Sequence, residues 1–568
     1  MTYEERERII SDDYADLIIE YNGNLAVLDV FADDTINILD FRFAIVHIPV
    51  ARITSFSTVE YPYSAIPACF GTTSEVSLEA SGINRLRNQP NFNLRGQGTL
   101  IGIIDTGIDY TNPVFRYPDG TTRIAALWDQ TIFSETQYPA NFNYGTEYRR
   151  EIINEALASD DPYSIVPSVD EDGHGTMIAS IAGGRDNPGA GFYGVATDAE
   201  FVIVKLKQAK PHLRRFFSIP SDVTCFQEND IMMGVSYLTR IARELGRPLS
   251  LCIALGSSHG AHDGTSPISD YLAMIADIAG NSVVVSAGNE GNARSHYFGV
   301  VDVNEEYETV ELNVAENEQG FLMEIWANSP NTFALDILTP TGEFVPRVNV
   351  RIIDNRKVTF IFEQTVLNID YIMAESQTGD QLVALRFFNP TSGIWRFRIY
   401  RDDNIPLSFH IWLPMKNFIS PDTYFTQSNI YTTLLIPGTS DVPIVATAYN
   451  PVNDSLYADA SRGFNRLGLP IPTIAAPGVG IVAASIDQTF ITVNGTGAAA
   501  AHTAGVAAML LEWGVVRGNV TSLDTVGIKN FIVRGARRDV SSVYPNRDWG
   551  YGILDIFNVF DVLRVEVI

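Results

Sequence analysis

The sequence predicts an α/β protein in which helices cover a parallel sheet. Apolar strands without alternation recur along the chain, which is typical of strands buried on both faces. Helical stretches separate these strands, as the connections of a parallel sheet require. A run of short alternating strands over about 298–432 interrupts this pattern. It predicts an inserted all-β domain of jelly-roll-like type.

The N-terminal part, 1–75, is expected to form a small α+β domain of its own. It opens with a charged stretch that predicts a short acidic helix. Strands are predicted at 25–30 and 41–49, where apolar residues alternate with others. The boundary with the main domain is expected between residues 71 and 77.

The main domain is expected to comprise 76–297 and 433–568. A helix is predicted from residue 78, and the strand pattern resumes beyond the insertion at 435–448. A helix carrying Gly497 and a segment around Trp549 complete the domain. The other elements expected here are buried strands at 96–105, 201–204, 249–255 and 282–286 and a helix over 227–245.

Charge and cysteine content exclude several classes of protein. The 568 residues carry a formal net charge of −28, which repels phosphates and argues against nucleic acid as a partner. A basic partner is favoured, although the charge also serves simply to keep a large surface soluble. The three cysteines, Cys69, Cys225 and Cys252, are too few and too scattered for a disulfide framework or a zinc cage.

The sequence shows no export or membrane signal. The first residues are too highly charged for a signal peptide, and no apolar run reaches the roughly 18 residues of a membrane span. Cytoplasmic synthesis without a signal peptide is therefore expected.

Three polar residues stand at the ends of predicted strands or at the start of a predicted helix. Asp105 ends a buried strand, at the edge where parallel sheets place their sites. His174 stands at the head of a predicted helix, and Asn289 closes a strand. Taken singly, each also fits ordinary structure: an Asp-Thr-Gly turn, an incidental histidine at a helix start, and a Gly-Asn turn.

A fourth motif decides between these interpretations. The stretch 494–505 reads N-G-T-G-A-A-A-A-H-T-A-G and resembles the nucleophile motif of the subtilisin-like serine proteases at every defined position except the serine, where Gly497 stands. The stretches around Asp105, His174 and Asn289 resemble the aspartate, histidine and oxyanion-hole motifs of the same family, in the same order. The chain is therefore identified as a member of the subtilase (peptidase S8) family.

This resemblance implies a role for each residue. Asp105 and His174 would be catalytic, Gly497 would occupy the nucleophile position, and Asn289 would line the oxyanion hole. Residues 255–257 resemble the substrate-cleft strand. Residues 1–75 would be a prodomain that lies in the chain's own cleft and stays uncleaved. No cofactor is expected. Many subtilases bind calcium and the acidic run at 170–172 suggests such a site, but acidic runs are usually solvated loops, so no metal site is assigned.

The long insertion, the small prodomain and the absence of a signal peptide resemble the Csp proteins of clostridial spore germination. This narrower resemblance implies incorporation into the spore. Implied partners are other Csp-type proteases or a cortex-hydrolase zymogen, and a small-molecule germinant.

Glycine at position 497 removes the nucleophile, and acyl transfer by serine requires that hydroxyl. Neither Thr496 nor Thr503 is expected to replace it, and His502 is expected to be a packed structural residue. The sequence therefore predicts a catalytically inactive pseudoprotease with a regulatory or sensing role. Two alternatives stay open: an active Csp-type subtilase whose serine has been replaced in this sequence, and a structural spore protein that docks through the insertion.

Overall fold

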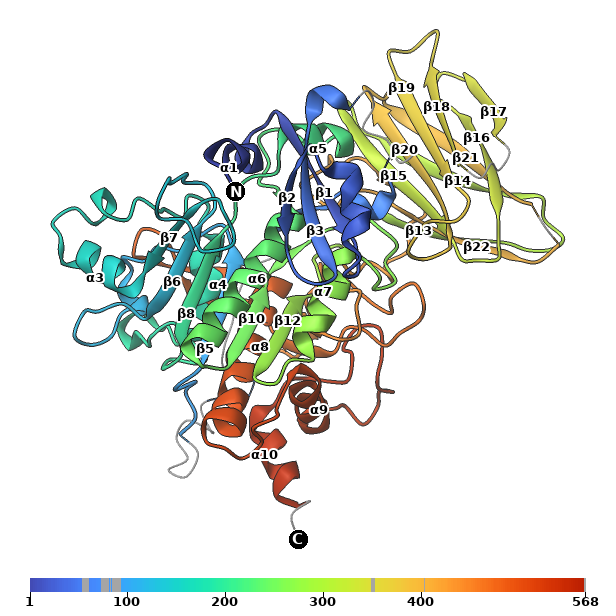
Figure 1. Cartoon of the computed structure of the whole chain (residues 1–568). Helices are drawn as coiled ribbons and strands as arrows, with labels where there is room; N and C mark the ends of the chain where they lie inside the picture. Colours follow the sequence, from blue (N-terminus) through green and yellow to red (C-terminus); the bar gives the residue numbers. More distant parts are fainter. Residues whose placement is uncertain are drawn as a thin grey trace.

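The computed structural model describes residues 1–53, 61–72, 81, 83, 93–348, 353–402 and 404–565. At its centre lies a nine-stranded sheet with the order β25-β24-β12-β10-β5-β8-β6-β7, and β26 pairs with β24 (Figure 1). Only β7 and β25, the two short strands at its ends, run antiparallel to their neighbours. Its strands are β5 Leu100–Asp105, β6 Ile124–Asp129, β7 Thr146–Arg149, β8 Glu200–Lys205, β10 Leu249–Ile253, β12 Asn281–Ser286, β24 Ile444–Asn450, β25 Ser455–Leu456 and β26 Ile474–Pro477. The predicted α/β fold is confirmed.

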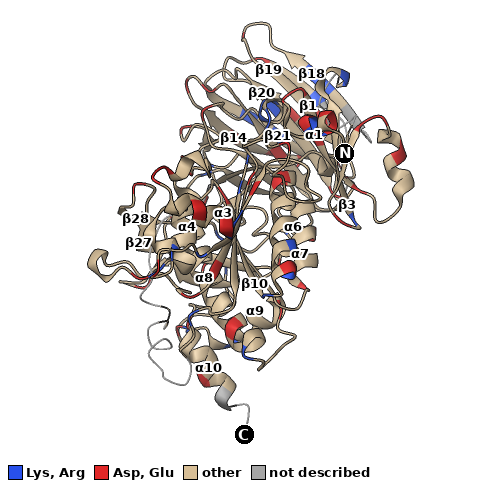
Figure 2. Ribbon diagram, turned by 60° about the vertical axis from the view of Figure 1, so that its left-hand side comes forward, with Lys and Arg blue, Asp and Glu red and all other residues tan. Residues whose placement is uncertain are grey.

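Helices cover both faces of this sheet (Figure 2). On one side lie α4 (His174–Gly183) and α8 (Thr496–Leu511); on the other lie α6 (Glu228–Leu245) and α7 (Pro267–Ala276). Successive residues of a strand therefore enter different hydrophobic clusters: Cys252 packs toward α4 and α8, and Ile253 toward α6 and α7. This explains why the strands are apolar without alternation.

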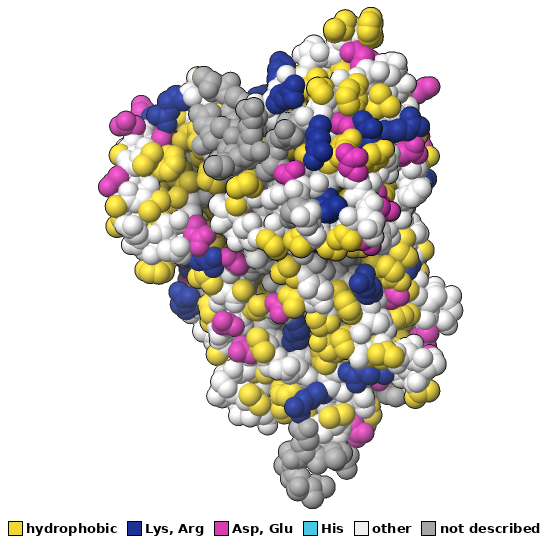
Figure 3. All heavy atoms as spheres, turned by 90° about the vertical axis from the view of Figure 1, so that its right-hand side faces the viewer, with side chains coloured by type: hydrophobic (Ala, Val, Ile, Leu, Met, Phe, Trp, Pro, Cys, Tyr) yellow, Lys and Arg dark blue, Asp and Glu magenta, His cyan; other side chains and the backbone are white. Residues whose placement is uncertain are grey.

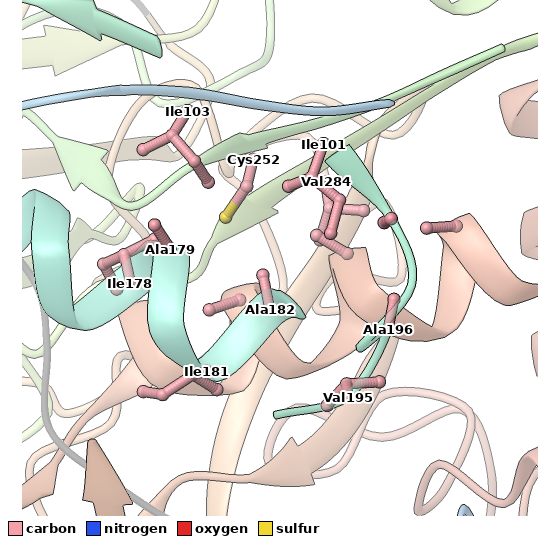
Figure 4. Packing of buried hydrophobic residues seen from close by; sticks show 14 of the residues in the cluster. Ile101, Ile103, Ile178, Ala179, Ile181, Ala182, Val195, Ala196, Cys252 and Val284 are labelled. Atoms are coloured by element: carbon pink, nitrogen blue, oxygen red, sulfur yellow. The ribbon is translucent and has the colours of Figure 1, made fainter. Parts of the chain in front are cut away.

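Small residues bring α8 close to α4 (Figure 4). A Cβ atom at Gly505 would lie 2.5 Å from the carbonyl oxygen of Ala182 and 2.5 Å from Cβ of Val195, so no larger residue fits. Every residue of α8 is buried. The segment Thr496–Val516 is long and apolar enough to cross a membrane, contrary to the expectation of no such run, but 83% of its apolar window is buried inside the protein. It is the core helix of the sheet domain.

The remaining helices flank this core. The C-terminal helix α10 was not predicted; it follows the turn segment around Trp549 and packs on α9, where Val559 leaves no room for a side chain at Gly535. These helices are α3 Arg150–Ala158, α5 Pro211–Phe217, α9 Thr525–Gly535 and α10 Ile556–Val565.

The N-terminal part begins with α1 (Tyr3–Ile10) and folds into a three-stranded sheet of β1 (Tyr14–Glu20), β3 (Phe43–Pro49) and β2 (Thr35–Ile38). The strand predicted at 25–30 is wrong. Leu25–Phe31 is a 3-10 helix, because the Asn24 side chain accepts the Ala26 N–H at 3.3 Å and only Leu28 is buried. The helix predicted from residue 78, and most of the predicted boundary, lie outside the described residues.

The N-terminal sheet packs on the helices α6 and α7. Phe43 and Ile45 of β3 share a hydrophobic cluster with Met232 of α6 and Tyr271 of α7. The rings of Phe43 and Tyr271 meet edge to face, with centroids 6.3 Å apart. The N-terminal part is therefore joined to the sheet domain by a continuous core.

The insertion forms two antiparallel sheets that enclose a separate hydrophobic cluster. One has the order β13-β22-β15-β20-β19-β18, and the other β17-β16-β21-β14-β23. The predicted domain boundaries, which fall after residues 75, 297 and 432, stay predictions. The strands are β13 His296–Val301, β14 Tyr307–Val314, β15 Gly320–Ala327, β16 Phe333–Leu338, β17 Phe344–Val348, β18 Ile353–Thr359, β19 Val366–Ile372, β20 Gln381–Phe388, β21 Gly393–Arg401, β22 Leu407–Trp412 and β23 Tyr424–Phe425.

Charges are dispersed over the molecule. The face shown in Figure 3 mixes hydrophobic, acidic and basic side chains.

Cys69, Cys225 and Cys252 are all buried free thiols.

Candidate active site

Asp105 and His174 form a buried hydrogen-bonded pair. Asp105 is the last residue of β5, and His174 is the first residue of α4. His174 Nδ1 lies 2.7 Å from Asp105 Oδ1, and the same carboxylate oxygen accepts the Thr106 N–H at 2.7 Å. The aspartate is 1% and the histidine 6% exposed. The carboxylate is therefore placed to orient the imidazole, as in a Ser-His-Asp triad.

Asp170 fixes the start of the histidine helix. Its carboxylate accepts the N–H groups of Gly173 and Thr176, both at 2.9 Å, and the Thr176 hydroxyl at 2.6 Å. Gly173 adopts a left-handed φ of +86° at the N-cap, which favours glycine. The expectation of a solvated acidic loop is wrong for Asp170, which is 1% exposed and caps α4. The neighbouring Glu171 is exposed and forms an ion pair with Lys205 at 2.7 Å.

A close backbone approach joins the aspartate and histidine segments. Gly175 N–H donates to Thr106 Oγ1 at 2.8 Å. A Cβ atom at Gly175 would lie only 2.2 Å from the carbonyl oxygen of Gly107. The glycines of both motifs are therefore required to bring Asp105 against His174.

Burial and the partner charge oppose each other at His174. Burial would lower the pKa of the imidazole, but the charge of Asp105 and its hydrogen bond outweigh burial and raise this pKa above the usual value of 6.5. Burial raises the pKa of the Asp105 carboxyl, against the opposing effect of His174.

Among the residues that the structure describes, nothing hydrogen-bonds to His174 Nε2, which is buried. In a Ser-His-Asp triad this nitrogen takes the proton of the serine hydroxyl. The ring is thus held on one side only.

Asn289 is tied to the first turn of α8. Its Oδ1 accepts the Thr496 N–H and the Thr496 hydroxyl, both at 3.1 Å, and Thr496 Oγ1 accepts the Gly288 N–H at 3.0 Å. Because the backbone N–H of Thr496 can only donate, the atom that it meets must be the amide oxygen of Asn289, and the NH2 group is at the other end of the amide. The same arrangement also engages the Thr496 hydroxyl, while Thr503 donates to Ala499 O at 2.7 Å. Gly497, the residue after Thr496, is buried in the first turn of α8.

A cavity of about 400 Å3 brings the sequence motifs together. His174, Asn289 and Asn494 all line it. Asn494 ends β28 (Phe490–Asn494), which pairs with β27 (Val479–Ala484), and precedes Gly497 by three positions. Lys416 and Asn417, from the segment that follows β22, also line the cavity and were not predicted. No motif marks them, because only the fold places them there.

The predicted substrate-cleft strand is paired with the chain's own N-terminal part. β4 (Cys69–Thr72) lies between β9 (Phe226–Gln227) and β11 (Leu255–Gly256). Thr72 pairs with Leu255 and Gly71 with Gly256, both antiparallel. A Cβ atom at Gly71 would lie 3.0 Å from the Met415 methyl carbon, so the segment after β22 covers this strand.

Two further expectations concern His502 and metals. His502 hydrogen-bonds to the Ser81 hydroxyl inside the protein. Within the ranges that the structure describes, no group of three or more His, Cys, Asp or Glu side chains is placed to hold a metal ion.

Comparison with known proteins places this site in a family. The sequence profile of the Subtilase family matches residues 96–310 and 423–552, which include all four motifs and omit most of the insertion. The chain belongs to the subtilase family. The structure of the Clostridium perfringens CspB protease superposes on this subtilase with a TM-score of 0.77, at 30% sequence identity, over 86% of this chain and 97% of that one. This likeness supports a Csp-type subtilase.

More distant relatives share parts of the subtilase. A PII-type proteinase of Lacticaseibacillus paracasei is 26% identical over 224 residues, which are 37% of this chain and 10% of the proteinase. The chain thus spans only about a tenth of the length of that relative. The subtilisin-like protease SBT3.6 of Arabidopsis thaliana is 23% identical over 484 residues, 77% of this chain and 58% of that protein. The catalytic roles of Asp105, His174, Asn289 and position 497 stay predictions.

Proposed function

We propose that this subtilase is a catalytically inactive pseudoprotease with a regulatory or sensing role in spore germination. It acts by binding a partner rather than by cutting. Its partners are another Csp-type protease, a cortex-hydrolase zymogen or a small-molecule germinant. It is made in the cytoplasm and incorporated into the spore.

The observation that carries the proposal is Gly497, which stands at the nucleophile position of the family motif. The Asp105–His174 pair, Asn289 and the start of α8 are all held by hydrogen bonds, yet His174 Nε2 meets no donor or acceptor in the described part of the chain. Gly497 offers neither a hydroxyl nor a Cβ. In subtilisin, a relative, loss of the catalytic serine lowers turnover by roughly a million-fold.

The strand β4 supports the same function. It fills the position of a substrate strand between β9 and β11. A chain without a nucleophile has no means of cleaving the connection that follows Thr72. The N-terminal part is therefore expected to remain covalently attached as an uncleaved prodomain.

The germination role is supported by the likeness to the Clostridium perfringens CspB protease over nearly the whole of that chain. A pseudoprotease of the same architecture is suited to bind what its active relatives bind.

Two measurements test the proposal. Mass spectrometry of the natively produced protein should find the intact 62.6 kDa chain. A fluorophosphonate probe, which reacts only with an activated serine, should leave the protein unlabelled and should label Gly497→Ser. Self-processing of the unmodified chain between residues 72 and 81 would overturn the proposal.

The first alternative, an active Csp-type subtilase whose serine is replaced in this sequence, is favoured by the intact Asp105–His174 pair. If Gly497→Ser both labels and processes itself as fast as active subtilases do, this alternative gains support. If it labels but does not process, the rest of the site has diverged from a working protease.

The second alternative is a structural spore protein that docks through the insertion. Ile361 and Phe362 favour it, because they are 85% and 84% exposed at a turn between β18 and β19. The Glu343 carboxylate accepts both their N–H groups, at 2.9 and 2.5 Å, which holds the turn outward. Replacing both residues by serine should abolish incorporation into spores if this alternative holds.

A further inference from the structure

The turn between β18 and β19 carries strongly exposed apolar side chains. Ile361 and Phe362 are 85% and 84% exposed, and Phe344, the first residue of β17, is 50% exposed. We call these three side chains the tip of the insertion. Large apolar side chains gathered on a surface mark a contact with another molecule.

Hydrogen bonds hold the tip in one conformation. The Glu343 carboxylate accepts the N–H groups of Ile361 and Phe362. The Thr341 hydroxyl donates to Glu363 Oε1 on the same turn. A partner therefore does not have to order the tip when it binds, which lowers the entropic cost of the contact.

The base of the tip is acidic. Glu343 and Glu363 both lie there, and neither forms an ion pair in the described part of the chain. The arginines of the adjoining strands β17 and β21 pair instead with Asp402 and Asp336. A surface that fits the tip is therefore apolar and has a basic rim.

A groove with these properties lies on the same chain, between the N-terminal part and the helices α6 and α7. Its volume is about 430 Å3. Ile38 of β2, Met274 of α7 and Ile278, which follows α7, line it and are 46%, 37% and 39% exposed. Met233 and Tyr271, which also line it, are buried. The groove therefore offers apolar side chains to a partner.

The side of the groove that α6 forms is basic. Arg240 and Arg243 both line it. Arg240 pairs with Glu147 at 3.3 Å, whereas Arg243 is exposed and has no ion pair among the residues that the structure describes. One carboxylate, Asp40 of the N-terminal part, also lines the groove, and its Oδ1 accepts two backbone N–H groups at 2.7 Å. Arg243 is therefore available to a carboxylate of a partner.

One chain cannot place its own tip in its own groove. Both Figure 1 and Figure 2 show the strands β18 and β19 far from α6 and α7. The hydrogen bonds that fix the tip also keep it from reaching across the molecule. A contact between tip and groove therefore joins two copies of the chain. Because two different surfaces meet, the contact is head-to-tail and can be repeated from copy to copy.

We propose that the tip of one copy of this chain docks into the groove of a second copy. Phe362 packs between Met274 and Ile278, and the Glu363 carboxylate lies at Arg243. The net charge of −28 repels the copies from one another and the patch is small, so the association is weak and depends on protein concentration. The inference goes beyond the proposed function and does not depend on it.

Sedimentation velocity of the full-length protein measures this association. The weight-average mass of the unmodified protein should rise above the 62.6 kDa of a single chain as the protein concentration increases. Phe362→Ser should weaken the association about thirtyfold, the effect of losing a central aromatic residue of an interface. Met274→Asp should weaken it at least as much, because it places a charge in the apolar groove. Both positions are exposed, so the melting temperature should stay unchanged.

Two further variants test the charge and the location of the contact. Arg243→Glu should weaken the association about tenfold, because it brings two carboxylates together. Val543→Ser is the matched control, since Val543 is 84% exposed like Phe362 but lies between α9 and α10, and it should leave the association unchanged. If Arg243→Glu associates as the unmodified protein does, or if Val543→Ser weakens the association as Phe362→Ser does, the tip and the groove are not the surfaces that meet.

Mixing two variants tests the head-to-tail arrangement. Phe362→Ser retains the groove, and Met274→Asp retains the tip. At a concentration where each variant alone is monomeric, their mixture should form a dimer and nothing larger, because only one intact tip and one intact groove remain. A mixture that stays monomeric, or an unmodified protein that stays monomeric at every concentration, overturns the inference. None of these results depends on whether Gly497 abolishes proteolysis.

Discussion

His174 Nδ1 lies 2.7 Å from Asp105 Oδ1, and both side chains are almost completely buried. The hydrogen bond gives this pair a structural value that does not depend on catalysis, because removing either partner would leave the other buried and unpaired. Retention of both residues beside Gly497 is therefore consistent with a protein that no longer cuts.

The first prediction concerns the pH dependence of this pair. The pKa of His174 is raised in the folded protein, so the stability that the pair contributes is complete below about 6.5 and is lost as pH rises through the raised value. The melting temperature of the unmodified protein minus that of His174→Gln should therefore fall as pH increases from 6 to 9. A difference that stays constant or grows over this range would contradict the assignment.

The second prediction concerns the cap of α4. Asp170→Ala removes the acceptor of three hydrogen bonds and should cost about 2 kcal/mol, the upper range for an N-cap. The thermal midpoint should fall by several degrees. In the Gly497→Ser background, fluorophosphonate labelling should slow as well, because the cap positions His174.

Glu171→Ala is the matched control for that change. Its side chain is 73% exposed, and the buried Lys205 ammonium keeps its hydrogen bond to the Val169 carbonyl oxygen. Removing the ion pair should therefore alter stability by less than about 1 kcal/mol. Equal effects of the two variants would mean that Asp170 does not cap the helix.

The sheet and the four motifs could be predicted because local sequence determines them. Strands buried on both faces must be apolar throughout, and the glycines that allow close approach, such as Gly175 and Gly505, stand at fixed positions in their motifs. The 3-10 helix at Leu25–Phe31 could not be predicted in this way. Its apolar residues suggested a strand, but five of its seven side chains are exposed and the Asn24 cap favours a helical turn.

The rest of the site depends on contacts between distant segments. Asp170 lies in a run of acidic residues that is typical of a solvated loop. In the folded protein, however, its carboxylate is buried against the start of α4. Lys416 reaches the cavity of His174 because the insertion returns across the cleft. Partners separated by so many residues leave no local signal in a single sequence.

The third prediction concerns the buried charges that join the N-terminal part to the sheet domain. Asp16 of β1 lies 2.7 Å from Lys210 Nζ and 2.6 Å from His47 Nδ1, and Gln227 Nε2 donates to it at 2.6 Å. Burial would raise the pKa of Asp16, but Lys210 and His47 hold it well below its usual range. Asp16→Ala leaves Lys210 buried and unpaired and should cost about 3–5 kcal/mol.

The measurement is the melting temperature together with the rate at which protease removes the N-terminal part. The double variant Asp16→Leu/Lys210→Met should recover most of the loss, because apolar replacements can substitute for a buried ion pair. Asp454→Ala, which breaks the exposed pair with Arg537, should cost less than about 1 kcal/mol. A loss from Asp16→Ala no larger than this would show that the buried pair does not hold the two parts together.

The last prediction concerns Glu290, the residue after Asn289. It is 2% exposed, and its Oε2 accepts the Lys416 N–H at 3.0 Å. Burial raises the pKa of its carboxyl to about 7, against the opposing effect of Lys416. Because the pKa of Glu290 is higher in the folded protein than in the unfolded chain, the neutral carboxyl makes its full contribution to stability below about pH 4.5. This contribution is lost as the pH rises to about 7. The loss is of order 3 kcal/mol.

Glu290→Gln stays neutral and keeps an oxygen acceptor for Lys416. It should therefore melt at the same temperature as the unmodified protein near pH 4 and at a higher temperature above pH 7. Glu155→Gln, at an exposed position of α3, should follow the unmodified protein at every pH. If Glu290→Gln retains the full decline in melting temperature between pH 4.5 and 7, ionisation of Glu290 does not weaken its contact with Lys416 in the segment that covers the cleft.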